Sequence, residues 1–182
     1  PLTSATEVVL RRLREVNEPF RLTFVMHAVP SLGRDAARCV PLLVERLRGA
    51  LGLLVAAIPI MVEQKRGQIV GVSSLAGQRG LPTSAVYSAT KAALSTFLES
   101  VRIDLAGTGV YATDVQPGFV ATPMTEGLPL PAKATISADR CAELILAAAR
   151  RGPGDVYVPW PWAWVMRIIR WMPSFVFRRL SV

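Results

Sequence analysis

Short apolar segments alternate with amphipathic segments along this chain, and the alternation predicts an order of strands and helices. Strands of a parallel sheet are short apolar runs, whereas helices place apolar residues three or four positions apart. These patterns predict strands at 21–26, 68–73, 110–116 and 155–158. They predict helices at 4–17, 41–64, 84–106 and 137–150. Strands alternating with helices are typical of parallel βαβ units, so we expect one α/β domain over residues 1–158.

Local signals support three of the predicted helices. Residues 4–7 (Ser-Ala-Thr-Glu) fit the capping-box pattern at the start of the first helix. Thr83 or Ser84 can cap the helix at 84–106, and Gly107 can end it. The helix at 41–64 is apolar around too much of its circumference to face solvent, so we expect it between the sheet and a neighbour.

Composition narrows the class of protein further. Hydrophobic residues make up 51% of the 182 positions and charged residues 19%, which excludes a disordered chain. Cys39, Cys141 and the single His27 are too scattered for a zinc site or a disulfide framework, so we expect buried thiols in a reducing compartment. The longest apolar run, 50–62, contains Pro59 and is too short to cross a bilayer. With no signal-peptide pattern at the start, these features predict a cytoplasmic location.

Two predicted strand ends indicate where a ligand would bind. In a parallel sheet, ligands bind beyond the carboxyl ends of the strands. Ser73 and Ser74 follow the second predicted strand, and Pro117 and Gly118 follow the third. We therefore expect the chemistry of the protein at this edge of the sheet.

Tyr87 and Lys91 lie between these two segments, in the first turns of a predicted helix. Four residues apart, they share one helical face. An unperturbed tyrosine has a pKa near 10, too high for a base at neutral pH. A neighbouring ammonium and the positive end of the helix dipole both favour the phenolate. The pair is therefore a candidate acid/base site, although such a pair alone is more often only an amphipathic helix face.

Three motifs at set spacings make the signal specific. They are Val-Ser-Ser-Leu-Ala-Gly at 72–77, Tyr-Ser-Ala-Thr-Lys at 87–91 and Pro-Gly-Phe-Val-Ala-Thr at 117–122. In this order the sequence resembles the short-chain dehydrogenase/reductase family. The resemblance implies a three-layer Rossmann-like parallel sheet, incomplete at its N-terminal side, with helices on both faces. It also implies an NAD(P)-dependent oxidoreductase that interconverts an alcohol and a carbonyl.

The resemblance assigns roles to individual residues. Ser74 would donate a hydrogen bond to the substrate oxygen, and the family spacing to the tyrosine favours it over Ser73. Tyr87 would be the general acid/base. Lys91 would lower the pKa of Tyr87 and bind the nicotinamide ribose. The cofactor, NAD or NADP, would also be held around Pro117, Gly118, Val120 and Thr122.

The sequence departs from the family pattern in three places. It contains no glycine-rich phosphate loop, and by the motifs Leu2-Thr3 falls where the third strand of the family ends. The Asn-Asn-Ala-Gly turn of the family is Met-His-Ala-Val at 26–29, and Arg46 stands where active members carry an asparagine. The strand at 21–26 would also be left with an exposed edge. Two interpretations stay open: a truncated reductase, or a catalytically impaired relative acting as a membrane-surface or protein-interaction module.

Residues 159–182 form a basic, aromatic extension. It holds all four tryptophans, at 160, 162, 164 and 171, and arginines at 167, 170, 178 and 179. Trp164, Ile168 and Trp171 share a helical face. Aromatic anchors with arginines are typical of a helix lying on an anionic bilayer, so we expect peripheral membrane contact through 160–182. A subunit contact or a lid over the substrate pocket would explain the same segment.

The sequence also indicates the substrate class, the oligomeric state and the absence of a nucleic-acid partner. The apolar loop 119–131 indicates a small hydrophobic substrate. In the family, the helices corresponding to 41–64 and to the one carrying Tyr87 form subunit interfaces, so we expect a homo-oligomer, which light scattering would detect. The net charge of +8 comes with no nucleic-acid-binding motif, and we expect no nucleic acid as partner.

Overall fold

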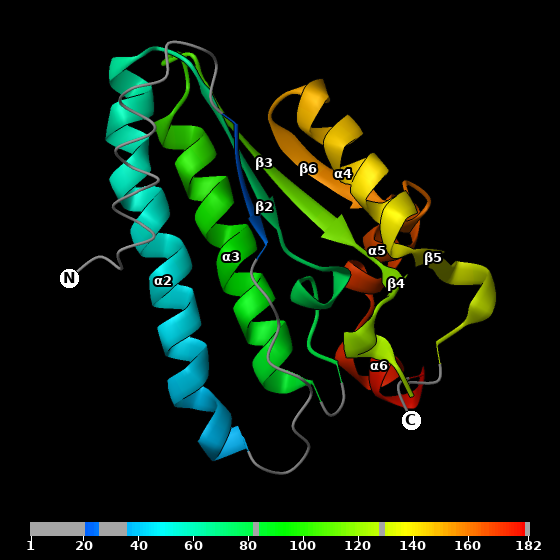
Figure 1. The fold of residues 1–182 in the computed structure, drawn as a ribbon. Coiled ribbons are helices and arrows are strands. Elements are labelled where there is room, and N and C mark those ends of the chain that lie inside the picture. The colour runs from blue at the N-terminus through cyan, green and yellow to red at the C-terminus, as the bar shows by residue number, and fades with distance from the viewer. Residues whose placement is uncertain (1–20, 26–35, 82–83, 128–129, 181–182) are drawn as a thin grey trace.

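The computed structural model describes residues 21–25, 36–81, 84–127 and 130–180. Their centre is a parallel sheet of four strands in the order β1-β2-β3-β6 (Figure 1). The strands are β1 (Arg21–Val25), β2 (Gly67–Val72), β3 (Val110–Pro117) and β6 (Gly154–Val158). All four predicted strands are confirmed, with bounds that differ by one residue. Val72 pairs with Val25 on one side and with Val115 on the other, so the carboxyl ends of these strands meet at one edge.

Three long helices cover the two faces of this sheet. They are α2 (Ala36–Glu63), α3 (Ala85–Asp104) and α4 (Ala138–Arg151). In Figure 1, α2 and α3 lie together on one side of the sheet and α4 lies on the other. This three-layer arrangement confirms the predicted α/β fold. Two helix boundaries differ from the prediction. α2 begins at Ala36 instead of 41, since Pro41 removes one helical hydrogen bond without ending the helix. α3 ends at Asp104 with Leu105 as its C-cap, and Ser84 is the N-cap but its side chain makes no capping hydrogen bond.

The core divides according to the two-residue period of the strands. Ile69 of β2 packs with Leu54 and Met61 of α2 and with Leu94 and Leu98 of α3. The next residue, Val70, faces the other way and packs against α4 in a second cluster. That cluster contains Val115, Cys141, Ala148, Ala149 and Val158. Each face of the central strand therefore has its own hydrophobic core, and Cys141 is buried, as expected.

A smaller two-stranded sheet lies beyond the carboxyl end of β3. β4 (Phe119–Ala121) pairs in parallel with β5 (Thr135–Ser137). Three short 3-10 helices also connect the main elements: η1 (Leu75–Gly77), η2 (Pro123–Thr125) and η3 (Ala132–Ala134). The sequence did not predict these elements, because three residues are too few to show a periodic pattern.

The C-terminal extension folds into two helices, α5 (Trp162–Trp171) and α6 (Ser174–Leu180). Pro173 separates them. Gly118 N donates to Val158 O at 2.9 Å, which ties the residue after β3 to the strand that leads into the extension. In Figure 1 both helices lie at the end of the sheet where β2 and β3 finish. Within the described ranges, no helix combines the length and apolarity that a membrane span requires.

Several expectations lie outside the described residues. They concern the helix at 4–17, the turn at 26–29 and the side chains of Cys39 and Arg46. Within the described part of the sheet, β1 is an edge strand. Val44 and Val55 are exposed on α2, and the homo-oligomer through this helix stays a prediction.

Candidate active site

Ser74, Tyr87 and Lys91 come together at the carboxyl end of β2. Ser74 follows that strand and is the N-cap of η1, where its Oγ accepts a hydrogen bond from Ala76 N at 3.2 Å. Tyr87 and Lys91 occupy the first two turns of α3. Ser74 lies beside Tyr87 and, as a hydrogen-bonding group, acts to lower the pKa of the phenol. Two segments separated in sequence are thus joined at the predicted edge of the sheet.

Burial controls the ionisation of Tyr87. It raises the pKa of the phenol above its ordinary value, while the hydrogen bond with Ser74 works in the opposite direction. The sequence predicted a lowered pKa because Lys91 lies on the same helix face. That direction was wrong: the loss of water around the phenol outweighs the favourable interactions. Tyr87 is therefore a protonated group at neutral pH and can donate a proton.

Lys91 is buried, with only 4% of its surface exposed. Its Nζ donates to Val72 O at 3.0 Å and lies 5.8 Å from the centroid of the Tyr87 ring. Burial lowers the pKa of Lys91 to about 8, although the negative charge of Asp114 favours the ammonium. The structure thus places a buried amine, which gains or loses its proton near pH 8, beside the ring of Tyr87.

Asp114 belongs to a polar network beneath these residues. Its Oδ1 accepts from Ser73 Oγ at 2.5 Å, and its Oδ2 accepts from Gln116 Nε2 at 2.8 Å. Gln116 Oε1 in turn accepts from Gln78 Nε2 at 2.8 Å. Burial raises the pKa of Asp114, and the hydrogen bond from Ser73 opposes that shift. The adjacent serines therefore have different surroundings: Ser73 donates to the buried carboxyl of Asp114, whereas Ser74 accepts from Ala76 N and lies beside Tyr87.

The lowered pKa of Lys91 predicts a pH dependence of stability. The pKa is about 8 in the folded protein against 10.5 for an ordinary lysine, so above pH 8 the unfolded chain binds more protons. Stability then rises with pH until the unfolded lysine also titrates. Between pH 8 and about 9.5, we expect Lys91 to increase the free energy of unfolding by about 1–2 kcal/mol. Urea denaturation of the wild type and Lys91→Met across this range measures the difference, and parallel curves would contradict it.

The segment after β3 is held by its own hydrogen bonds. Because Gly118 N already donates to Val158 O, that N–H is not available to a ligand. A Cβ at Gly118 would lie 2.4 Å from Trp162 Nε1, so only glycine lets α5 approach this closely. Thr122 and Thr125 form a capping box around η2, and Thr125 Oγ1 donates to Val120 O at 2.8 Å. The structure therefore brings this motif to the same edge of the sheet as a rigid segment.

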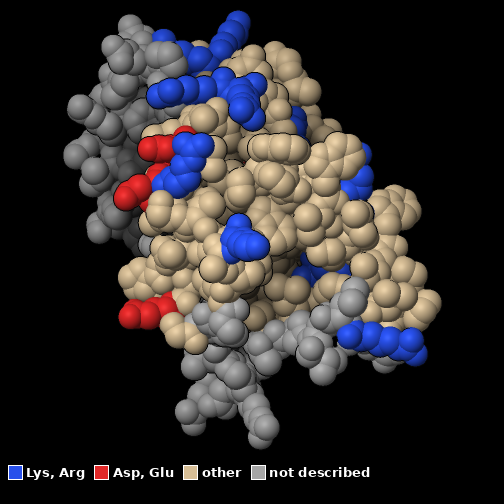
Figure 2. All heavy atoms as spheres, turned by 90° about the vertical axis from the view of Figure 1, so that its right-hand side faces the viewer, with Lys and Arg blue, Asp and Glu red and all other residues tan. Residues whose placement is uncertain are grey.

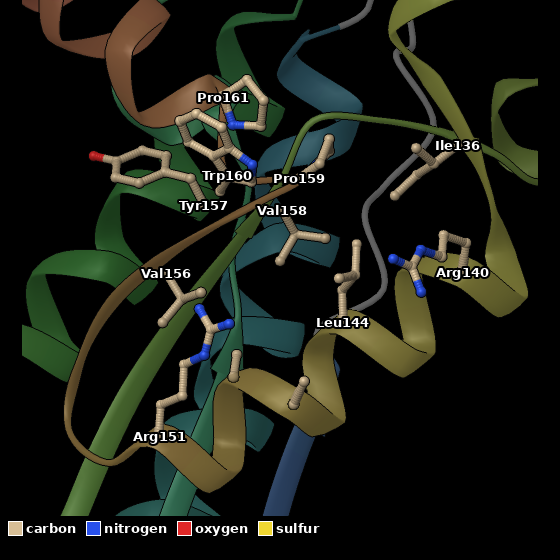
Figure 3. A pocket seen from close by; sticks show the side chains of 12 residues that line it. Ile136, Arg140, Leu144, Arg151, Val156, Tyr157, Val158, Pro159, Trp160 and Pro161 are labelled. Carbon is tan, nitrogen blue, oxygen red and sulfur yellow. The ribbon is translucent and has the colours of Figure 1, made fainter.

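Two surface pockets open near this edge. One, of about 460 Å³, is lined by Ala121, Thr122, Pro123, Thr125, Glu126 and Leu130, directly after β4. The other, of about 450 Å³, lies between α4, β6 and the start of the extension. Figure 3 shows Leu144 and Val158 pointing toward one another there, with the guanidinium groups of Arg140 and Arg151 on either side. Neither of these pockets is lined by Ser74, Tyr87 or Lys91.

Sequence reasoning missed three residues around the site. Asp114 gave a signal, because a carboxylate inside an apolar strand needs buried partners. Trp162 and Arg79 gave no such signal, because their contact partners lie far from them in the sequence. Arg79 Nη1 donates to Ile169 O at 2.8 Å and to Met172 O at 2.5 Å, across more than 80 residues of chain.

Comparisons with known proteins agree with the fold and the motifs. The family model described as short chain dehydrogenase matches residues 43–131. An uncharacterised oxidoreductase of Myxococcus xanthus is 46% identical over 129 residues, which are 71% of this chain and 51% of that protein. A second one, from Mycobacterium tuberculosis, is 34% identical over 146 residues, 80% of this chain and 58% of that protein. The chain thus spans about half the length of the curated relatives it matches.

Solved structures share the same fold. A short-chain dehydrogenase of Burkholderia cenocepacia, crystallised with NADP, superimposes with a TM-score of 0.79 at 24% identity, covering 100% of this chain and 80% of that one. A short-chain dehydrogenase of Sphingobium yanoikuyae in complex with NADPH gives 0.72 at 23% identity, covering 85% and 62%. With the motifs, the relatives and the parallel sheet in agreement, the chain belongs to the short-chain dehydrogenase/reductase family.

Proposed function

We propose that this chain carries the catalytic residues of an NAD(P)-dependent oxidoreductase that interconverts an alcohol and a carbonyl. The observation that supports this most is the placement of Ser74 and the buried Lys91 beside Tyr87: Ser74 acts on the pKa of the phenol, and Lys91 Nζ lies 5.8 Å from the centre of the Tyr87 ring. A helix face with only a structural role has no need to bury a lysine beside a tyrosine, because removing an ammonium group from water costs free energy.

In the reductive direction, Tyr87 is the proton donor. As the carbonyl oxygen gains negative charge, the Tyr87 hydroxyl transfers its proton to that oxygen and becomes a phenolate. The Ser74 hydroxyl donates a hydrogen bond to the same oxygen and stabilises the developing charge. Lys91 stabilises the phenolate electrostatically. Oxidation of the alcohol reverses each of these steps.

The site offers suitable groups for a nicotinamide cofactor. When bound, a nicotinamide dinucleotide supplies or accepts the hydride. The ammonium of Lys91 and the hydroxyl of Tyr87 are the donors that a ribose diol requires, and Lys91 already donates to a backbone oxygen at 3.0 Å. Backbone groups around Pro117 and Val120, with Thr122, are the further candidates for holding the nicotinamide. The two structural neighbours that hold NADP(H) favour NADP over NAD for this chain.

We further propose a hydrophobic substrate. The pocket after β4 presents Ala121, Pro123 and Leu130 beside a single carboxylate, Glu126. Phe119 is exposed on the same short strand. Apolar walls with few polar groups suit a substrate whose reactive oxygen is its main polar atom.

Cofactor titration separates this function from a non-catalytic interaction module. We expect NADPH fluorescence to change saturably when the purified chain is added. The double variant Tyr87→Phe/Lys91→Ala should lose at least about tenfold in affinity, the equivalent of about 1.4 kcal/mol. Tyr111→Phe, an exposed position on β3, is the matched control. Equal titration curves for the wild type and the double variant would contradict the proposal.

A further inference from the structure

The C-terminal extension, residues 159–182, exposes several large apolar side chains in and just before its two helices, more than is usual on a monomeric protein. Trp171 is 84% exposed, Trp160 68% and Ile168 67%. Trp164, Val165 and Phe175 are exposed as well. We call these six residues the aromatic surface. Single exposed apolar residues are common on proteins, but Trp164, Ile168 and Trp171 share one face of α5, and such an exposed apolar stripe is typical of an interaction site.

The aromatic surface is separate from the side of α5 that packs on the protein. Met166 is buried, and Trp162 lies edge-on to Phe119 with ring centroids 5.6 Å apart. At 100° per residue, Trp164, Ile168 and Trp171 fall on the opposite side of the helix from Met166. One side of α5 is thus used by the fold, and the other side is apolar without contributing to the core.

Positive charge flanks the aromatic surface. The guanidinium of Arg167 lies 5.1 Å from the centre of the Trp164 ring, and Arg170 and Arg179 are exposed elsewhere on the same two helices. No acidic residue follows Asp155 in the sequence. Figure 2 views the side of the molecule at the right of Figure 1: uncharged groups fill most of it, basic groups are spread across it, and acidic groups lie toward its left margin. An anionic partner would complement this charge.

The aromatic surface is held in place before any partner binds. Arg79 donates to two carbonyl groups at the end of α5, and its guanidinium stacks 4.5 Å from the centre of the Phe177 ring in α6. These contacts fix both helices to the segment between η1 and α3. A preformed surface loses little conformational entropy on binding.

We propose that the aromatic surface binds the interface of an anionic lipid bilayer. The tryptophans and Ile168 would enter the headgroup region, and the arginines would contact lipid phosphates, as in interfacial helices. A second copy of this chain fits the charge less well. A symmetric dimer through this surface would bring Arg167 of both copies close together with no carboxylate from the segment to compensate. The proposal does not depend on the oxidoreductase function.

Vesicle cosedimentation tests this proposal directly. We expect the chain to bind vesicles of phosphatidylcholine with phosphatidylglycerol, and to bind vesicles of phosphatidylcholine alone at least about tenfold more weakly. The triple variant Trp164→Ala/Ile168→Ala/Trp171→Ala should lose at least about tenfold in partition coefficient. Arg167→Gln/Arg170→Gln should reduce only the preference for the anionic vesicles. Ile103→Ala/Tyr111→Ala removes exposed apolar groups from other elements and should bind as the wild type does.

The other outcomes are distinguishable. Circular dichroism verifies that each variant is folded, and all substituted side chains are exposed. Absence of binding to both vesicle types would overturn the proposal, as would equal loss in the control variant. A dimer that the triple variant dissociates, with no vesicle binding in the wild type, would assign the aromatic surface to a second copy instead. None of these readouts requires a cofactor or substrate.

Discussion

Replacing Tyr87 by phenylalanine is expected to lower kcat for carbonyl reduction by about 10²–10⁴-fold, the range that one general acid contributes. The substitution keeps the ring in its buried position but removes the hydroxyl beside Ser74. Since the proton donor is lost while the surrounding contacts stay, kcat should fall far more than the affinity for NADPH. Steady-state assays with a panel of apolar ketones and aldehydes measure the effect.

The control for this experiment is Tyr111→Phe, which removes a hydroxyl from an exposed tyrosine on β3. It should leave kcat unchanged. A Tyr87→Phe protein that retains wild-type kcat would show that the phenol is not the acid. If the wild-type chain binds NADPH but reduces none of these ketones and aldehydes, the proposed cofactor site is supported and the proposed apolar substrate class is contradicted.

Gly71 and Leu98 are expected to show the largest effects on stability. A Cβ at Gly71 would lie 2.2 Å from Leu98 Cδ1, and Leu98 is completely buried. Gly71→Ala should therefore cost about 1–3 kcal/mol through overpacking. Leu98→Ala should cost about 2–5 kcal/mol through the lost apolar contacts and the cavity left behind.

The double variant makes this prediction specific. In Gly71→Ala/Leu98→Ala, the new methyl group occupies part of the space that the leucine leaves, so the combined cost should be at least about 1 kcal/mol below the sum. Guanidinium chloride denaturation gives all three values. Gly80→Ala, where a Cβ meets nothing within 4 Å, is the matched control. Strictly additive costs would show that α3 and β2 do not touch at this point.

Periodicity predicted the main sheet because its strands are continuous apolar runs, and it predicted three helices from their amphipathic faces. It failed for β4 and β5, whose hydrogen bonds form only after distant segments meet. Helix geometry placed Tyr87 and Lys91 on one face, and the resemblance of three ordered motifs to a known family added Ser74 and the role of each residue. The direction of the pKa shift of Tyr87 could not be predicted from the sequence. Burial sets that direction, and burial depends on the packing of the whole molecule; it raises the pKa, whereas Lys91 alone was expected to lower it.

Arg79 connects the two regions to which separate tasks are proposed above, the end of α5 and the segment between Ser74 and Tyr87. Its guanidinium holds the end of α5, while its backbone belongs to the connection between Ser74 and Tyr87. If adsorption at the C-terminal helices and ligand binding at the sheet edge both favour this contact, each must strengthen the other by the same factor. Adsorbed protein would then bind the cofactor with higher affinity, and cofactor-loaded protein would bind the surface with higher affinity by the same factor.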